Sequence, residues 1–161
     1  MTKYKYRTTV LISVLSVICG CTDSGREAFE RGVRASHKGD FDSAITDFNE
    51  VIRLDPKYAG AYYNRGEAYE HKGENDKGIA DFTEAIRLDP YDKLAYESRA
   101  MAYEKKSDYD KEIADCTEAI RLDPKFSPAY FLRAGAYEKK GDRAKADEDL
   151  TQAKKLGYKS P

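Results

Sequence analysis

Apolar residues recur at helical spacing along the chain, and residues 59–92 show the pattern in full. Their first stretch carries a narrow apolar stripe, because Tyr62, Gly66 and Tyr69 stand at positions i, i+4 and i+7. A wider stripe follows Gly73 and is made by Ile79, Phe82, Ala85, Ile86 and Leu88. The pattern predicts two helices joined by a turn.

The same pair of stretches returns along the chain at a fixed interval. The phrase "AIRLDP" occurs at 85–90 and 119–124, and the near copy "VIRLDP" occurs at 51–56, each copy 34 residues after the last. Aligning these phrases divides the chain into four units and a tail at 159–161; the units cover residues 25–58, 59–92, 93–126 and 127–158. One helix pair cannot bury its own apolar face, so each unit is expected to cover its neighbour.

The predicted second helices have start and stop signals. Their side-chain caps are expected to be Asp40, Asp108 and Asp142, which can accept hydrogen bonds from free N–H groups. Proline cannot continue a helix, and the prolines at the expected ends are Pro56, Pro90 and Pro124.

A 34-residue helix–turn–helix unit with this spacing resembles the tetratricopeptide repeat. The matching residues in the second unit are Tyr62, Gly66, Tyr69, Phe82, Ala85 and Pro90. The sequence departs from the family pattern at Arg65, Gly78, Glu112, Cys116 and Tyr158. The resemblance covers nearly all of the chain after Cys21 and implies an all-α, right-handed α-solenoid of four tandem helix–turn–helix repeats.

The fourth unit differs from the others on its second helix. The first three units carry isoleucine pairs there: Ile45 and Ile52, Ile79 and Ile86, and Ile113 and Ile120. The fourth has Asp147 and Lys154 at the equivalent places. A charged outer face is what a terminal capping repeat requires, so the array is expected to end with this unit.

Arginine and aspartate also recur with the 34-residue period. The arginines are Arg31, Arg65, Arg99 and Arg133, and the aspartates are Asp47, Asp81, Asp115 and Asp149. An early position on one helix of an antiparallel hairpin faces a late position on the other, so each Arg is expected to pair with the Asp of its own unit. The alternative is a ladder of arginines that binds an anionic ligand.

The N-terminus has the pattern of an export signal. Lys3, Lys5 and Arg7 precede a short apolar run that ends in "ICGC", and this run is too short to span a bilayer as a helix. The ending resembles the bacterial lipoprotein signal, which implies that residues 1–20 are a signal peptide, that Cys21 is lipidated, and that 21–24 form a short linker. The alternative is an ordinary secretory signal. Under the lipoprotein rules, Thr22 favours the outer membrane, with the protein facing the periplasm.

No residue pattern points to catalysis. The sequence has no nucleophile motif, phosphate loop or metal-ligand spacing, and His37 and His71 are equivalent positions in adjacent units, expected about 8–10 Å or more apart. Cys116 stands where other units have Phe48 and Phe82, so an inert buried thiol is expected. A net charge of −1 offers no basic surplus for nucleic acid. We therefore expect no enzyme activity, cofactor, metal, nucleic-acid ligand or small-molecule substrate.

The family resemblance implies a concave groove, lined by the first helices, that takes a peptide or a partner helix. This predicted groove would present Phe29, Glu30, Val33, Tyr63, Asn64, Glu67, His71, Glu97, Ser98, Met101, Phe131, Leu132 and Gly135. Five of its apolar members are not needed for the repeat's own core, namely Phe29, Tyr63, Met101, Phe131 and Leu132. The alternative is that some of them pack between adjacent first helices.

Some relatives bind acidic C-terminal peptides through a clamp of Lys, Asn and Arg. Asn64 fits one place of this clamp, but Phe29, Val33, Leu94 and Ser98 occupy the others. The sequence instead suggests a neutral or basic partner segment with one or two apolar anchors.

Together these features predict a non-catalytic adaptor, anchored to the membrane through Cys21, that serves as an accessory subunit of an envelope complex. Two alternatives stay open: a self-assembling structural protein, and a regulator of a periplasmic protease or cell-wall hydrolase.

Overall fold

The computed structural model describes residues 24–158, so the predicted signal peptide, Cys21 and the tail lie outside the described residues. A helix covers residues 24–37, and seven more follow it: α2 (Phe41–Leu54), α3 (Ala59–His71), α4 (Asn75–Leu88), α5 (Lys93–Lys105), α6 (Tyr109–Leu122), α7 (Ser127–Lys139) and α8 (Arg143–Lys155). Residues 24–158 contain no strand.

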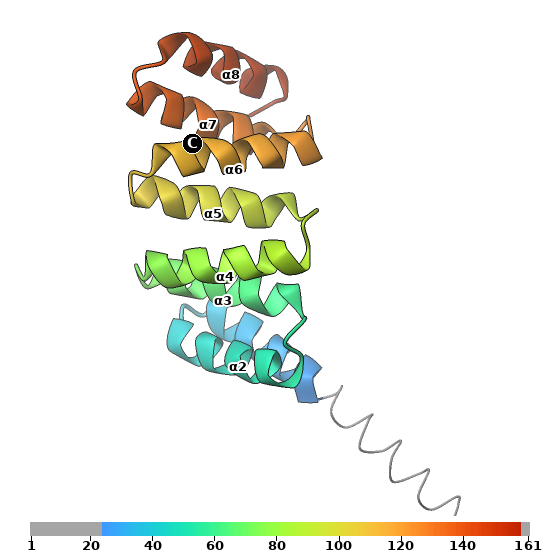
Figure 1. Cartoon of the computed structure of the whole chain (residues 1–161). Helices are drawn as coiled ribbons and strands as arrows, with labels where there is room; N and C mark the ends of the chain where they lie inside the picture. Colours follow the sequence, from blue (N-terminus) through green and yellow to red (C-terminus); the bar gives the residue numbers. More distant parts are fainter. Residues whose placement is uncertain (1–23, 159–161) are drawn as a thin grey trace, which may run out of the picture.

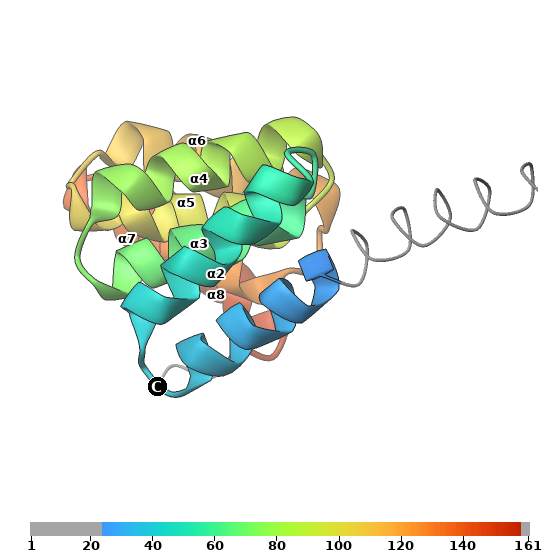
Figure 2. The same cartoon turned by 90° about the horizontal axis from the view of Figure 1, so that it is seen from below.

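The helices form a single stack in chain order, with the N-terminal unit at one end and α8 at the other (Figure 1). Each helix from α2 onward packs against the next, and α5 also touches α3 and α7, the first helices of the neighbouring units. Seen from below, α2 and α4 cross at an angle, so successive units are turned relative to one another (Figure 2). The predicted all-α solenoid is confirmed.

Local signals fix the ends of the second helices. The side chains of Asp40, Asp108 and Asp142 accept hydrogen bonds from the backbone N–H groups of Ser43, Lys111 and Lys145, so all three predicted caps are confirmed. The second helices of the first three units end at Leu54, Leu88 and Leu122, two residues before each proline.

The turn inside each unit needs a residue in the left-handed backbone region. Glycine takes this place in three units, with φ of 75° at Gly39, 76° at Gly73 and 82° at Gly141. Ser107 takes it in the third unit with φ of 58°. A side chain disfavours this conformation, so the third unit has the most strained turn of the four.

Each core fits a large side chain against a small one on the facing helix. Phe48 and Phe82 are fully buried. A Cβ atom added at Gly32 would lie 2.7 Å from the Phe48 ring, and one at Gly66 would lie 2.8 Å from the Phe82 ring. The third unit has the buried pair Ala100 and Cys116 at these places. A smaller partner on the second helix therefore leaves room for a methyl group on the first.

The predicted Arg–Asp pairs form in all four units. Arg65 donates from Nε and Nη2 to Asp81 at 2.7 and 2.6 Å, and Arg99 donates in the same way to Asp115 at 2.8 and 2.7 Å. Arg133 pairs with Asp149, and the more exposed Arg31 pairs with Asp47.

A further bond from three of these four arginines reaches the preceding unit. Nη1 of Arg65 donates to Asn49, and the same atom of Arg99 and Arg133 donates to Thr83 and Thr117. Each of these three arginines therefore joins the two helices of its own unit and connects that unit to the one before. These bonds favour the structural interpretation over an anion-binding ladder.

The second helix of the fourth unit has a charged outer face. Asp147 and Lys154 are exposed on α8, where the other units place half-buried isoleucines. Ala146, Asp149 and Ala153 face inward and are buried.

Candidate functional site

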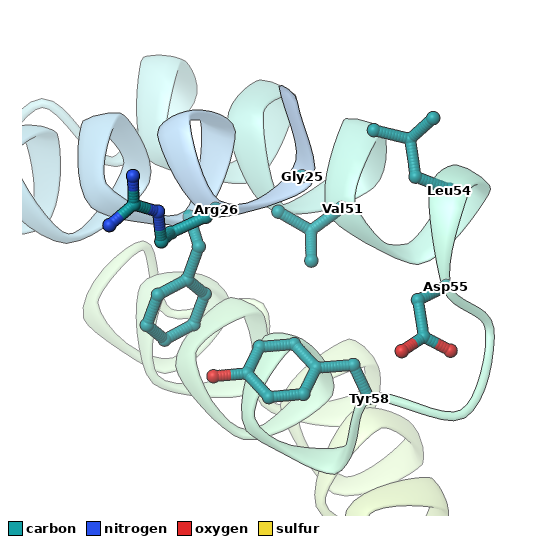
Figure 3. Close-up of a pocket in the computed structure, with 7 residues that line it drawn as sticks. Gly25, Arg26, Val51, Leu54, Asp55 and Tyr58 are labelled. Carbon is teal, nitrogen blue, oxygen red and sulfur yellow. The ribbon is translucent and has the colours of Figure 1, made fainter. Parts of the chain in front are cut away.

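The first unit contains a cavity of about 470 Å³ between its two helices. Its apolar walls come from Phe29, Val51, Leu54 and Tyr58, and Gly25, Arg26 and Asp55 complete the lining. Figure 3 shows the side chains of Val51 and Tyr58 directed into the space, with Arg26 and Asp55 on opposite sides. The rings of Phe29 and Tyr58 meet edge to face with centroids 5.2 Å apart.

A smaller hollow of about 190 Å³ lies among the helices of the last two units. Its lining consists of Glu104, Phe131, Leu132, Ala134, Gly135, Glu138 and Leu150. Phe131 stacks on Tyr158 with ring centroids 4.5 Å apart, so one aromatic face is already covered. Both hollows contain predicted groove residues, Phe29 at one end of the array and Phe131 and Leu132 at the other.

Hydrogen bonds connect α3 to α5 between these hollows. Tyr63 donates its hydroxyl proton to Glu67 at 3.0 Å and accepts a bond from Ser98 at 3.3 Å. Ser98 is buried, and the Tyr63 ring lies against Phe82 with centroids 5.8 Å apart. Burial raises the pKa of the Tyr63 hydroxyl, so the phenol is neutral and available as a donor. Tyr63 therefore holds two first helices together.

Two half-buried carboxyl groups lie on α3 and α5. Burial raises the pKa of Glu67, and the Tyr63 hydroxyl partly offsets this rise. Burial also raises the pKa of Glu97, which Lys93 partly offsets. The structure describes no salt bridge for either group, whereas Asp81, Asp115 and Asp149 are all bound to arginine. Glu67 and Glu97 would consequently gain from an incoming cation.

The remaining predicted groove residues differ from one another in burial and contacts. Met101 and Leu132 are half-buried, and the Asn64 amide donates to the Gly60 carbonyl oxygen of its own helix at 2.7 Å. The exposed His71 stacks on Phe41 of α2, with ring centroids 4.7 Å apart and the ring planes 6° from parallel. This contact places His71 at the joint between two units.

Part of the predicted groove belongs to the core. Phe29 and Val33 pack against the buried cluster of Ala44, Phe48 and Ala68, and Tyr63 packs as described above. The prediction that the core does not need the large apolar groove residues is therefore wrong for Phe29 and Tyr63. The alternative of packing within the array applies to them. Met101 and Leu132 remain the better candidates for contact with a partner.

Sequence reasoning missed two features. Leu54, at the end of α2, and Asp55 and Tyr58, just after it, form one wall of the larger cavity. The expected groove considered first helices alone. The carboxyl group of Glu112 is buried in α6 at 1% exposure. When the four units are aligned with one another, position 112 stands out, because it holds a glutamate where two other units have alanine and one has glycine.

The described residues offer no metal site and no reactive thiol. No group of three or more His, Cys, Asp or Glu side chains within residues 24–158 could hold a metal ion. Cys116 is buried, and burial raises the pKa of its thiol. None of the helices in this part of the chain is long and apolar enough to cross a membrane.

The repeats match known family patterns along most of the chain. Residues 37–73 match the family described as TPR repeat, and residues 59–92 match the one described as Tetratricopeptide repeat. Residues 94–126 and 127–156 match a Tetratricopeptide repeat pattern as well. The chain belongs to the tetratricopeptide repeat (TPR) family. Its members bind proteins and peptides, and this TPR chain has the fold of such an interaction scaffold.

Solved TPR structures superpose closely on the array. The "Crystal structure of MamA" has a TM-score of 0.81 and 26% identity, over 88% of this chain and 82% of that one. The "Arabidopsis OM64 TPR domain" has a TM-score of 0.71 and 24% identity, over 74% of this chain and 98% of that domain. The "Second TPR of Spaghetti (RPAP3) bound to HSP90 peptide SRMEEVD" has a TM-score of 0.61 and 31% identity, over 63% and 94%. No curated protein sequence matches the chain.

Proposed function

We propose that this TPR protein is a lipid-anchored adaptor that binds a segment of a partner protein along its first helices. The observation that carries the proposal is the arrangement of two partly apolar hollows, one toward each end of the array. On the helices between them lie the half-buried carboxyl groups of Glu67 and Glu97, for which residues 24–158 show no salt bridge. The RPAP3 structure supports it, since a related TPR domain binds a peptide.

The partner segment we propose carries apolar side chains for the hollows and a basic side chain for the carboxyl groups. An acidic peptide does not suit this surface. Binding such a peptide would place its carboxylates near Glu67 and Glu97, and Asn64 is already bonded to its own helix. We therefore expect SRMEEVD, the peptide bound by the RPAP3 domain, to bind this chain at least tenfold more weakly than a basic peptide with apolar anchors.

The location we propose is the periplasmic face of a bacterial outer membrane. The basis is the lipoprotein-like ending "ICGC" and Thr22 after it. At most about 10 Å of chain separates Cys21 from the helix that begins at residue 24, so the array would lie close to the lipid surface. An accessory subunit held beside a membrane complex would need this short connection.

Binding can be tested with two groove variants and a matched control. Met101→Asp and Leu132→Asp place a charge on half-buried first-helix positions, and Ala114→Asp places the same charge on an exposed position of α6. The full-length protein and each variant would be used to capture partners from envelope extract. We expect the two groove variants to lose a partner that the control retains. Equal capture by all three variants would contradict the groove assignment.

Anchoring requires a separate test, because it can fail while binding succeeds. Cys21→Ser should move the protein from the membrane to the soluble fraction and abolish incorporation of radiolabelled palmitate, whereas Cys19→Ser should leave both unchanged. Labelling of the Cys21→Ser variant would contradict the lipoprotein assignment.

A further inference from the structure

Glu112 occupies a position that the other units reserve for a small side chain. The equivalent residues are Ala44, Gly78 and Ala146, all buried. A Cβ atom added at Gly78 would lie 3.2 Å from the Gly66 carbonyl oxygen and 3.8 Å from the Glu70 nitrogen, so this position faces the first helix of its own unit at close range. The repeat therefore places Glu112 against α5.

The third unit has room for this larger side chain because a neighbouring side chain is small. Cys116, one helical turn after Glu112, replaces the phenyl ring that Phe48 and Phe82 supply in the first two units. Glu112 is 1% exposed and counts with Phe48 and Phe82 among the largest fully buried side chains. The carboxyl group thus fills space that an aromatic ring fills elsewhere.

The described part of the chain provides no cationic partner for the buried group. Within residues 24–158, atom Oε2 of Glu112 is buried and has no hydrogen-bond partner. Arg99, the arginine of α5, is bound to Asp115. Arg133 of α7 is bound to Asp149, and Lys140, which follows α7 directly, is bound to Asp110.

The other charged groups around this contact are mainly acidic. Glu104 of α5 opposes ionisation of Glu112 directly. Glu97 of α5 and Asp115 of α6 also oppose ionisation of the adjacent Cys116 thiol, whereas Arg133 of α7 favours it. Burial, with a smaller contribution from Glu104, raises the pKa of Glu112 to about 7. A neutral carboxylic acid suits this site, and a carboxylate does not.

We propose that Glu112 makes the contact between α5 and α6 a proton-dependent joint of the array: the joint is closed while the acid is protonated and loosens when the acid ionises. Protonation leaves a neutral group in a buried space. Loss of the proton leaves an unpaired carboxylate, which gains free energy by reaching water. The helices that would move include α5, which carries Glu97 and Met101.

The direction of the pH effect follows from the protons bound in each state. An unfolded chain ionises Glu112 near 4.5, whereas the folded chain keeps the proton up to about pH 7. Between these values the folded state binds more protons, so this group's contribution to stability is full below about pH 4.5 and falls as pH rises toward 7. Above about pH 7 the loss is complete.

The experiment compares wild type with Glu112→Gln by urea denaturation at pH 5 and pH 8. Glutamine keeps the shape of the side chain and cannot ionise. We expect the unfolding constant of wild type, relative to that of the variant, to increase about 70-fold between the two pH values, the change that ionisation constants of 4.5 and about 7 imply. A relative change of less than threefold would overturn the proposal.

Two further measurements keep the test decisive if the glutamine variant does not fold. The carboxyl carbon of Glu112 in wild type can be titrated by NMR, and a midpoint below pH 5.5 would overturn the proposal. Amide hydrogen exchange, corrected for the intrinsic pH effect, should show protection lost in α5 and α6 between pH 5 and pH 8 while α2 keeps its protection. Equal loss in all helices would show global unfolding and would contradict a local joint.

Discussion

The second and third units share the phrase "AIRLDP" near their ends, yet their cores are built differently. Residues 59–92 bury Phe82 between Gly66 and Gly78, while residues 93–126 bury Cys116 between Ala100 and Glu112. The hydrogen-bonded arginines beside the two cores are nevertheless arranged in the same way. Each unit has its arginine bound to aspartate, and each arginine reaches back to the preceding unit.

The difference shows which property the array conserves. At each core the total volume of three side chains is maintained, since a methyl group and a carboxyl chain replace what a phenyl ring supplied. The chemistry of those side chains is free to vary, provided that the helices keep their separation. In the third unit this freedom introduces a buried acid and a strained serine into a backbone that matches its neighbour.

The largest effects should come from the Arg–Asp pairs that the units share. We expect Arg65→Met and Arg99→Met each to lower the free energy of unfolding by about 3 kcal/mol, because each leaves a buried aspartate without its partner. The control is Arg31→Met. The Arg31 side chain is 50% exposed, against 16% for Arg99, so its loss should cost about 1 kcal/mol or less. Urea denaturation measures all three. Similar losses for Arg31 and Arg99 would show that burial does not set the strength of the pair.

An intermediate effect should come from exchanging one core for the other. Cys116→Phe alone should destabilise the chain by about 2 kcal/mol, because the ring would meet Ala100 and Glu112. The triple variant Ala100→Gly, Glu112→Gly, Cys116→Phe recreates the core of the second unit and should recover most of that loss. A double-mutant cycle from the urea data tests the coupling. Additive costs would contradict the idea that volume is shared among these positions.

The smallest effect should come from the turns. Ser107→Gly relieves a left-handed serine and should stabilise the chain by about 1 kcal/mol, which a higher midpoint of thermal unfolding would reveal. The reverse change in the second unit, Gly73→Ser, should cost about the same amount. Stabilisation by both changes would mean that the turn conformation is not responsible.

Much of the fold was predictable because repetition supplies independent copies of the same signal. The 34-residue period located the joints, the aspartate caps and prolines marked the helix ends, and the paired periods of arginine and aspartate gave the ion pairs. The same comparison identified Asp147 and Lys154, which are exposed in the structure, as the charged positions of the fourth unit.

The surface was less predictable, since contact between adjacent first helices depends on distances that a period does not contain. Val33 and Met101 are equivalent in sequence, yet Val33 packs against a phenylalanine cluster in the first unit and the third unit has a cysteine at that place. The cavity in unit one was not predicted from the sequence, for a related reason. Its wall includes Tyr58, and the next unit has Asp92 there.

The contacts across the joints of the array are interchangeable. Lys72 binds Asp42 at 2.5 Å, and the same cross-joint contact returns between Lys106 and Asp76 and between Lys140 and Asp110. A duplicated 34-residue segment inserted between two units would present the matching lysine to one neighbour and the matching aspartate to the other. Gene duplication would thus lengthen the array by whole units without requiring any new contact between units, and α8 would still follow the other helices.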